Sequence, residues 1–253
     1  LSAKILNETG ISQGYATVYG SENYELLTDL IANTELKITV FDNDHQQVDK
    51  SRRYFDKLGI PTSRLAFLNY GLTQKYLPKY YSSLTIINDP VFLDNYNENS
   101  LARIYESLRP YGGKIWFNLK KKDQKKLLKT LASLDLYGVE ISENKGYSII
   151  TKSGALEGAA NWTHNYGNIA NTVKSDDQLV KAPLGILWFG GNSNLDVLPR
   201  HGHGPAQQIV DGLLIIQGIN TITARDVYTG RTIWQKVFES LKDDNWLVYY
   251  DET

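Results

Sequence analysis

The sequence contains no cysteine and no methionine among its 253 residues. The absence of cysteine excludes disulfide bonds, thiolate metal sites and a cysteine nucleophile, and it suits an oxidising compartment. Net charge is also small: 27 basic and 28 acidic residues give −1, which offers no general reason to expect nucleic acid as a partner. No apolar run reaches the ~18 residues that would span a bilayer. Sequence patterns of serine hydrolases, zinc peptidases and phosphate-binding loops are absent too.

The first 150 residues alternate apolar, strand-like runs with amphipathic helical stretches. Strands are predicted at 15–19, 37–41, 65–68, 84–88 and 114–117, and helices at 2–8, 24–32, 44–58, 100–108 and 123–133. Runs at 139–142 and 147–150 flank a turn sequence and predict a hairpin. This alternation predicts an α/β fold with a doubly wound, mostly parallel sheet, to which the hairpin adds an antiparallel strand.

Polar and glycine-containing segments follow the predicted strands in a recognisable order. They are the loop of Gly20 and Glu22 after the first strand, Asp42 at the end of the second, Asn69 and Tyr70 after the third, Asp89 after the fourth, and the turn 108–113 before the fifth. Over about residues 1–152 this resembles the Rossmann-like fold of class I S-adenosylmethionine-dependent methyltransferases. The resemblance implies that Asp42 would hold the ribose hydroxyls of S-adenosylmethionine and that Asn69 or Tyr70 would lie beside the adenine.

The first loop departs from the family pattern. The family reads Gly-x-Gly-x-Gly there, so that bare backbone approaches the cofactor. This chain has Gly20, Glu22 and Tyr24 at the three positions, and the side chain of Glu22 would crowd the ligand. Two hypotheses follow. We adopt a degenerate methyltransferase-like domain without a cofactor, acting as a scaffold or binding module; the alternative is an active methyltransferase that binds S-adenosylmethionine.

The sequence changes character after a small, glycine-rich linker at 153–160. Further strands are predicted at 184–189, 212–218 and 221–224, and another begins at 231. Ala224-x-Asp226-x-x-Thr229-Gly230-x-x-x-Trp234 resembles the hairpin signature in the blades of quinoprotein-type β-propellers. A blade needs roughly 40 residues and a ring at least four blades. Residues 161–253 therefore predict one to two blades of an incomplete, all-β propeller.

The blade signature has a structural explanation. Asp226 is expected to accept hydrogen bonds from turn amides and from the Thr229 hydroxyl. Gly230 is expected to supply a positive φ, and Trp234 to lie flat between adjacent blades.

The segments around Trp162 to Tyr166 and Pro183 to Trp188 extend the resemblance to the whole chain. Together they are similar to the opening of a propeller in secreted, planctomycete-type bacterial proteins, where a methyltransferase-like domain precedes a PQQ-repeat propeller. This implies a multidomain secreted or periplasmic protein, in which the partner of this segment is the rest of the propeller in the same or another chain. Because two glycines of the first loop are missing, we expect the segment to be noncatalytic. A part of a quinoprotein-type oxidoreductase is a second alternative, but we expect no PQQ in an incomplete ring.

Three histidines and one lysine run complete the candidates. His201 and His203 can point to the same side of an extended strand, and with His164 or Asp196 they could form a metal site; three imidazoles would suit zinc or copper. We favour packing and loop roles for them and expect no metal. The lysines between 120 and 126 are interpreted as the solvated side of a helix.

Overall fold

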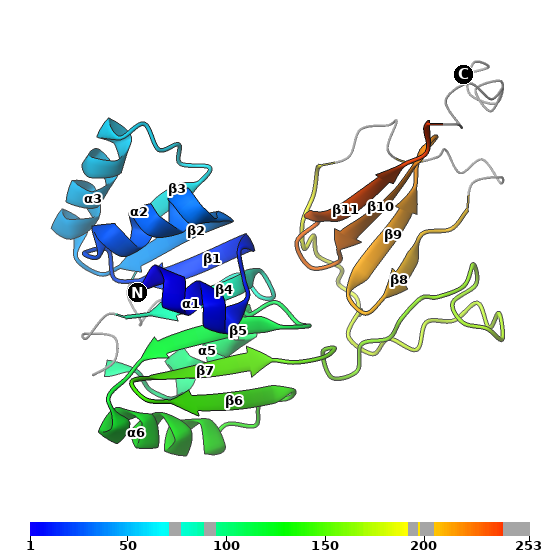
Figure 1. Cartoon of the computed structure of the whole chain (residues 1–253). Helices are drawn as coiled ribbons and strands as arrows, with labels where there is room; N and C mark the ends of the chain where they lie inside the picture. Colours follow the sequence, from blue (N-terminus) through cyan, green and yellow to red (C-terminus); the bar gives the residue numbers. More distant parts are fainter. Residues whose placement is uncertain (71–76, 89–94, 192–196, 198–204, 240–253) are drawn as a thin grey trace. The chain divides into compact units, whose positions relative to one another are not determined.

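The computed structural model describes residues 1–70, 77–88, 95–191, 197 and 205–239. The chain divides into two compact units, Leu1–Gly154 and Ala155–Thr253. Each unit contains one β-sheet (Figure 1).

The sheet of the first unit has seven strands in the order β3-β2-β1-β4-β5-β7-β6. They are β1 Gln13–Tyr19, β2 Glu35–Asp42, β3 Leu65–Asn69, β4 Ser82–Ile87, β5 Gly113–Asn118, β6 Val139–Asn144 and β7 Tyr147–Lys152. The strands β3, β2, β1, β4 and β5 are parallel, whereas β7 runs antiparallel to both β5 and β6. The doubly wound sheet and its hairpin are therefore confirmed, and the strand order reverses between β1 and β4.

Helices cover both faces of this sheet. They are α1 Ser2–Thr9, α2 Tyr24–Asn33, α3 His45–Lys57, α5 Glu98–Ser107 and α6 Lys121–Ala132. The first three pack through Ile5, Leu27 and Phe55 into one buried cluster, which includes Val18 of β1. α5 and α6 pack through residues such as Leu101 and Leu127 into a second cluster on the opposite face. The predicted helices are thus present, and they form the outer layers of an α/β/α arrangement.

The element boundaries follow from local chemistry. Gly10 ends α1 in the left-handed conformation, with φ 68°. Asn23 caps α2 by accepting from the Leu26 N–H, and Asp44 caps α3 in the same way. Before β5 the backbone turns so tightly that a Cβ on Gly113 would lie 2.9 Å from a backbone nitrogen, so this position needs glycine.

The second unit contains a four-stranded antiparallel sheet in the order β11-β10-β9-β8. Its strands are β8 Gln208–Val210, β9 Leu213–Gln217, β10 Thr221–Asp226 and β11 Thr232–Val237. The strands predicted at 212–218, 221–224 and after 231 are present, whereas β8, with three residues, was not predicted. Such a meander is the arrangement found within one propeller blade, but the described residues contain no second blade and no closed ring.

The strand predicted at 184–189 is wrong. These residues belong to no strand, and Leu184, Ile186 and Phe189 are 76%, 84% and 90% exposed. The run is apolar, but strand propensity needs a partner strand, and none pairs with it among the described residues. Instead the Trp188 indole N–H donates to the Val227 carbonyl at 2.8 Å, which fastens the segment to the β10–β11 turn.

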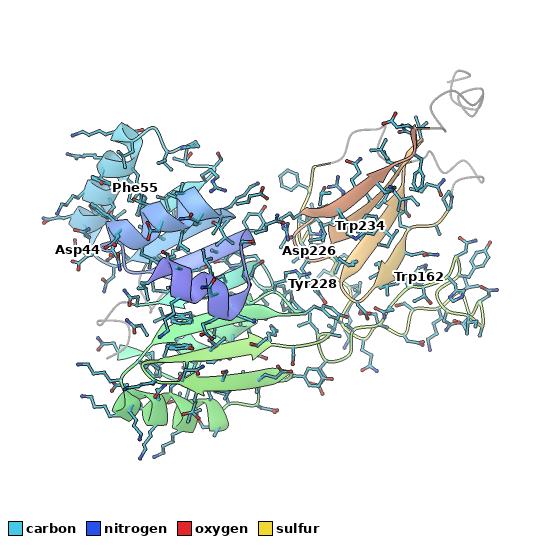
Figure 2. All side chains as sticks on the ribbon, in the orientation of Figure 1. Asp44, Phe55, Trp162, Asp226, Tyr228 and Trp234 are labelled. Carbon is cyan, nitrogen blue, oxygen red and sulfur yellow. The ribbon has the colours of Figure 1, made fainter. Side chains whose placement is uncertain are left out.

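The β10–β11 turn is built around Asp226. Its buried carboxylate accepts from the Tyr228 and Thr229 N–H groups at 2.8 and 3.2 Å (Figure 2 shows its place). Gly230 has φ 69°. One expectation needs correction: the Thr229 hydroxyl is buried without a hydrogen-bond partner in the described residues, and Asp226 accepts from backbone N–H groups of the turn. Trp234 is 44% exposed, and its packing between adjacent blades stays a prediction.

Candidate functional site

A cavity of about 850 Å³ lies at the carboxyl ends of β1, β2 and β4. Its wall comprises the end of β1, the loop into α2, the first turn of α2, the β2–α3 loop and Asn88 after β4. In open α/β sheets, ligands bind outside the carboxyl ends of strands where the strand order reverses. The volume falls within the range of roughly 300–1,000 Å³ that is typical of small-molecule sites. Position and size therefore make this cavity the candidate site of the first unit.

The loop after β1 is fastened to the end of β2. The Gly20 N–H donates to the Phe41 carbonyl at 2.9 Å, and the positive φ of Gly20, 93°, permits this bend. Ser21, which is fully buried, donates from both its N–H and its hydroxyl to Asp42 Oδ2, at 2.9 and 2.6 Å. The Ser21 carbonyl in turn accepts from the Ser51 hydroxyl at 3.2 Å. Ser21 is thus held on both sides.

Asp42 has little acceptor capacity left. Its second oxygen, Oδ1, accepts from the Asp44 N–H at 2.9 Å. A carboxylate offers about four lone-pair sites. With the two bonds from Ser21, three of these are used by the protein itself. The carboxylate that sequence reasoning assigned to a ligand therefore serves to join the β1–α2 and β2–α3 loops.

The predicted site residues separate into two groups. Gly20, Glu22 and Asp42 all line the cavity. Asn69 and Tyr70 do not: Asn69 is the last residue of β3 and Tyr70 the next. The Tyr70 N–H donates to the Asp42 carbonyl at 2.8 Å, and the Asn69 side-chain amide donates to the same carbonyl at 3.4 Å. Asp89 lies outside the described residues.

Two lining tyrosines were given no ligand role by the sequence reasoning. Tyr24, at the third glycine position of the family loop, stacks on Tyr54 with ring centroids 4.5 Å apart, and its hydroxyl lies 3.1 Å from the Ser51 hydroxyl. Tyr19 is 6% exposed, and burial, followed by the neighbouring Tyr81 and Tyr70, raises its pKa above the usual range. Its hydroxyl therefore stays protonated and cannot act as a base at neutral pH.

The cavity wall is acidic. It carries the carboxylates of Glu22, Glu25, Asp42 and Asp44, and among the described residues that line it there is no lysine, arginine or histidine. Asp44 accepts from the Gln46 and Gln47 N–H groups at the start of α3, so its charge is partly offset. Glu22 and Glu25 are exposed at the rim. A wall of one sign attracts cationic groups and repels a ligand carboxylate.

Comparison with known proteins shows the fold of the first unit. No family model and no curated protein matches the chain. Among solved structures, a Methanococcus maripaludis protein described as an S-adenosyl-L-methionine-dependent methyltransferase matches with a TM-score of 0.54 and 16% identity, over 61% of this chain and 84% of that one. The first unit has the class I methyltransferase fold.

Two further structures match less closely. A SAM-dependent methyltransferase from Aquifex aeolicus gives a TM-score of 0.47 at 13% identity, over 59% of this chain and 87% of that one. A SAM-dependent O-methyltransferase from Thermotoga maritima gives 0.48 at 14% identity, over 61% and 65%.

The residues of the methyltransferase-fold unit do not fit S-adenosylmethionine well. The cavity is large enough, and an acidic wall suits the sulfonium and ammonium groups of that molecule. However, a ribose diol donates two hydrogen bonds, and Asp42 has about one acceptor site free. Glu22 also places a carboxylate on the wall where the family has glycine.

The metal candidates are not brought together in the described residues. His164 is exposed, and its Nδ1 lies 2.8 Å from the Thr163 hydroxyl. Asp196, His201 and His203 lie outside the described residues. No group of three or more histidine, aspartate or glutamate side chains within the described ranges has the geometry to hold a metal.

No helix in the described ranges is both long and apolar enough to cross a membrane.

Proposed function

We propose that the methyltransferase-fold unit does not transfer methyl groups and acts as a scaffold or binding module in a larger secreted or periplasmic protein. The observation that carries this proposal is the engagement of Asp42 by Ser21 and Asp44, at 2.6 to 2.9 Å. In this proposal the β1–α2 and β2–α3 loops, which would bind a cofactor in an active enzyme, are hydrogen-bonded to each other instead.

Opening this arrangement for a ribose would be costly. The Ser21 hydroxyl would have to leave Asp42, although Ser21 is fully buried and its carbonyl is bonded to Ser51. A hydrogen bond to a charged group contributes about 1.5–3 kcal/mol, and a buried polar group without a partner costs about 1–3 kcal/mol. Both losses would be subtracted from the affinity of any ligand that needs Asp42.

The second unit supports the multidomain part of the proposal. We interpret its sheet as one blade of a propeller, completed by further residues of the same protein or by another chain. The strand register places Ile215, Ala224 and Trp234 on one face of the sheet, and Leu214 with Ile209 on the other. A sheet with apolar residues on both faces needs cover on both sides, as blades of a ring provide. In this interpretation the next blade covers the exposed part of Trp234.

An active methyltransferase remains the alternative, because the cavity persists at the topological switch point and its acidic wall attracts a cationic cofactor. It would use Asp42 for the ribose and Asn69 or Tyr70 near the adenine. This alternative requires Ser21 to release Asp42 when the ligand binds.

A variant that gains affinity for the cofactor product distinguishes the scaffold proposal from the active methyltransferase. We would titrate the whole chain and the variant Ser21→Ala/Glu22→Gly with S-adenosylhomocysteine in a calorimeter. If the proposal holds, the wild type releases no heat and the variant gains measurable affinity, because Asp42 regains acceptor sites and the wall loses a carboxylate. Equal affinity of both proteins would contradict it. Adding Asp42→Ala to the variant is the control and should abolish the gain.

A further inference from the structure

Seven exposed lysines lie at one corner of the first unit, six on or just before α6 and one in the β6–β7 turn. Lys126 lies over the ring of Tyr96. The other six, which we call the lysine corner, are Lys120, Lys121, Lys122, Lys125, Lys129 and Lys145. The buried amide of Gln124 holds the two segments together by donating to the Asn144 and Tyr147 carbonyls, both at 2.8 Å. The Leu119 N–H also donates to the Gly146 carbonyl at 3.1 Å. The lysine corner is therefore a fixed feature of the fold.

The sequence places several of these charges where they reduce helix stability, whereas Lys129 lies in the last turn of α6, where the helix dipole favours a cation. Lys121 and Lys122 lie in the first turn of α6, where the helix dipole disfavours cations, and Asp123 is the only acid there. Lys121, Lys125 and Lys129 follow each other at i, i+4 spacing, so like charges are neighbours on the helix surface. None of the six lysines has a carboxylate within ion-pair distance in the described part of the chain. A cluster that breaks local rules without internal compensation points to a partner of opposite charge.

The chemistry of the corner favours an anionic surface over a nucleic-acid strand. All six cations are lysines, which are hydrated point charges, whereas arginine is the residue suited to bidentate phosphate recognition. Binding of single strands also relies on exposed aromatic side chains on which bases stack. The rings of Tyr96, over which Lys126 lies at 4.6 Å, and of Tyr147, which follows the β6–β7 turn, are both buried. Clusters of about four to eight lysines on a helix are typical of binding to acidic phospholipids.

We infer that the lysine corner docks the protein on the surface of a bilayer that contains acidic phospholipids. The buried face of α6, with Leu127 and Leu131, stays in the core, so the contact is electrostatic and nothing inserts. On the outer side of α6 the side chains project away from the sheet (Figure 2), and the six lysines of the lysine corner are exposed. The corner also lies at the same edge of the sheet as the cavity, because the Asn118 side chain at the end of β5 donates to Asn88 on the cavity wall at 2.6 Å.

Vesicle co-sedimentation tests this inference. The whole chain is mixed with phosphatidylcholine vesicles, with or without phosphatidylglycerol, at low and high salt. Each lysine near an acidic surface contributes about fivefold to partitioning. We expect binding only to the acidic vesicles, lost at high salt because charges are screened within about 10 Å. Lys121→Glu/Lys125→Glu should lower partitioning at least about 25-fold, while Lys50→Glu/Lys57→Glu on α3 keeps wild-type binding.

Thermal unfolding of the variants shows whether a loss of vesicle binding comes from misfolding. The unfolding temperature of Lys121→Glu/Lys125→Glu is measured beside that of the wild type. We expect it not to fall, because both positions are exposed and the glutamate that replaces Lys121 in the first turn complements the helix dipole. A loss of vesicle binding then cannot come from misfolding. No binding to acidic vesicles at low salt, or an equal loss in the α3 variant, would overturn the inference. So would tighter binding of a mixed-sequence oligonucleotide than of acidic vesicles.

Discussion

Ser21 determines the state of the candidate site at the scale of single residues. Its hydroxyl donates to Asp42 from a fully buried position. We expect Ser21→Ala to lower the free energy of unfolding of the first unit by about 1–3 kcal/mol, since a buried hydrogen bond to a carboxylate is lost. Urea denaturation measures this, with the exposed Ser12→Ala as the control. An unchanged midpoint would mean that the Ser21–Asp42 contact does not hold the loops together.

Lys152 gives the first unit a pH dependence. Burial lowers its pKa from 10.5 to about 8, opposed by the charge of Glu106 and aided by that of Lys79. The ammonium donates to the Tyr105 carbonyl at 3.2 Å and lies near two tyrosine rings. Between these two pKa values the unfolded chain binds a proton that the folded chain does not, so stability should rise as pH increases from about 8 towards 10.

The measurement is urea denaturation of wild type and Lys152→Met across this window. The variant should lose the rise, while Lys50→Met, at an exposed position, should keep it. The window ends near pH 10, because burial raises the pKa of Tyr96 and of Tyr105 to about 12, and both oppose the rise above that point. A fall in stability from pH 8 to 10 would contradict the assignment.

The sequence indicated that Gly20 and Asp42 lie close together, but not whether the Asp42 carboxylate is available to a ligand. Asp42 follows an apolar run and Gly20 follows another, and adjacent parallel strands bring such ends together. Whether a carboxylate faces a ligand or a loop depends on one neighbouring hydroxyl, and Ser21 carries no signal of its own at sequence level. The sequence also does not reveal which loop residues border the cavity. Asn69 and Tyr70 were predicted beside the adenine, yet neither lines the cavity.

At the scale of elements, one side chain anchors the segment 184–189. Trp188 donates to the Val227 carbonyl, and its ring lies so close to Gly230 that a Cβ there would meet the indole. We expect Trp188→Ala to destabilise the second unit by about 1–3 kcal/mol through lost packing and a lost hydrogen bond. Thermal unfolding followed by circular dichroism measures this. Phe189→Ala, at a 90% exposed position, is the matched control; an equal loss in both variants would sink the anchoring role.

Elements were predictable where a periodic pattern and a partner coincide. The helices α2 and α3 show both amphipathic spacing and a capping residue, Asn23 or Asp44. Residues 184–189 have the composition of a strand but no paired neighbour in the part of the chain that the structure describes, and composition alone does not reveal pairing. β8 is too short for alternation to register.

At the scale of the whole molecule, we expect the first unit to fold without the second. Both of its hydrophobic clusters consist only of residues before Gly154. We expect residues 1–154, expressed alone, to unfold cooperatively with the midpoint that this unit has in the whole chain. Differential scanning calorimetry of both proteins checks this. Non-cooperative unfolding of the excised unit would show that its core depends on the residues that follow.

The central claim is that the methyltransferase fold is kept here without cofactor binding. The most direct test is calorimetric titration of the whole wild-type chain with S-adenosylmethionine, on a sample shown to be folded by its unfolding transition. The account predicts no heat of binding, because Asp42 is engaged by Ser21 and Asp44. Micromolar binding that disappears in Asp42→Ala would contradict it and would establish the active methyltransferase alternative as the better one.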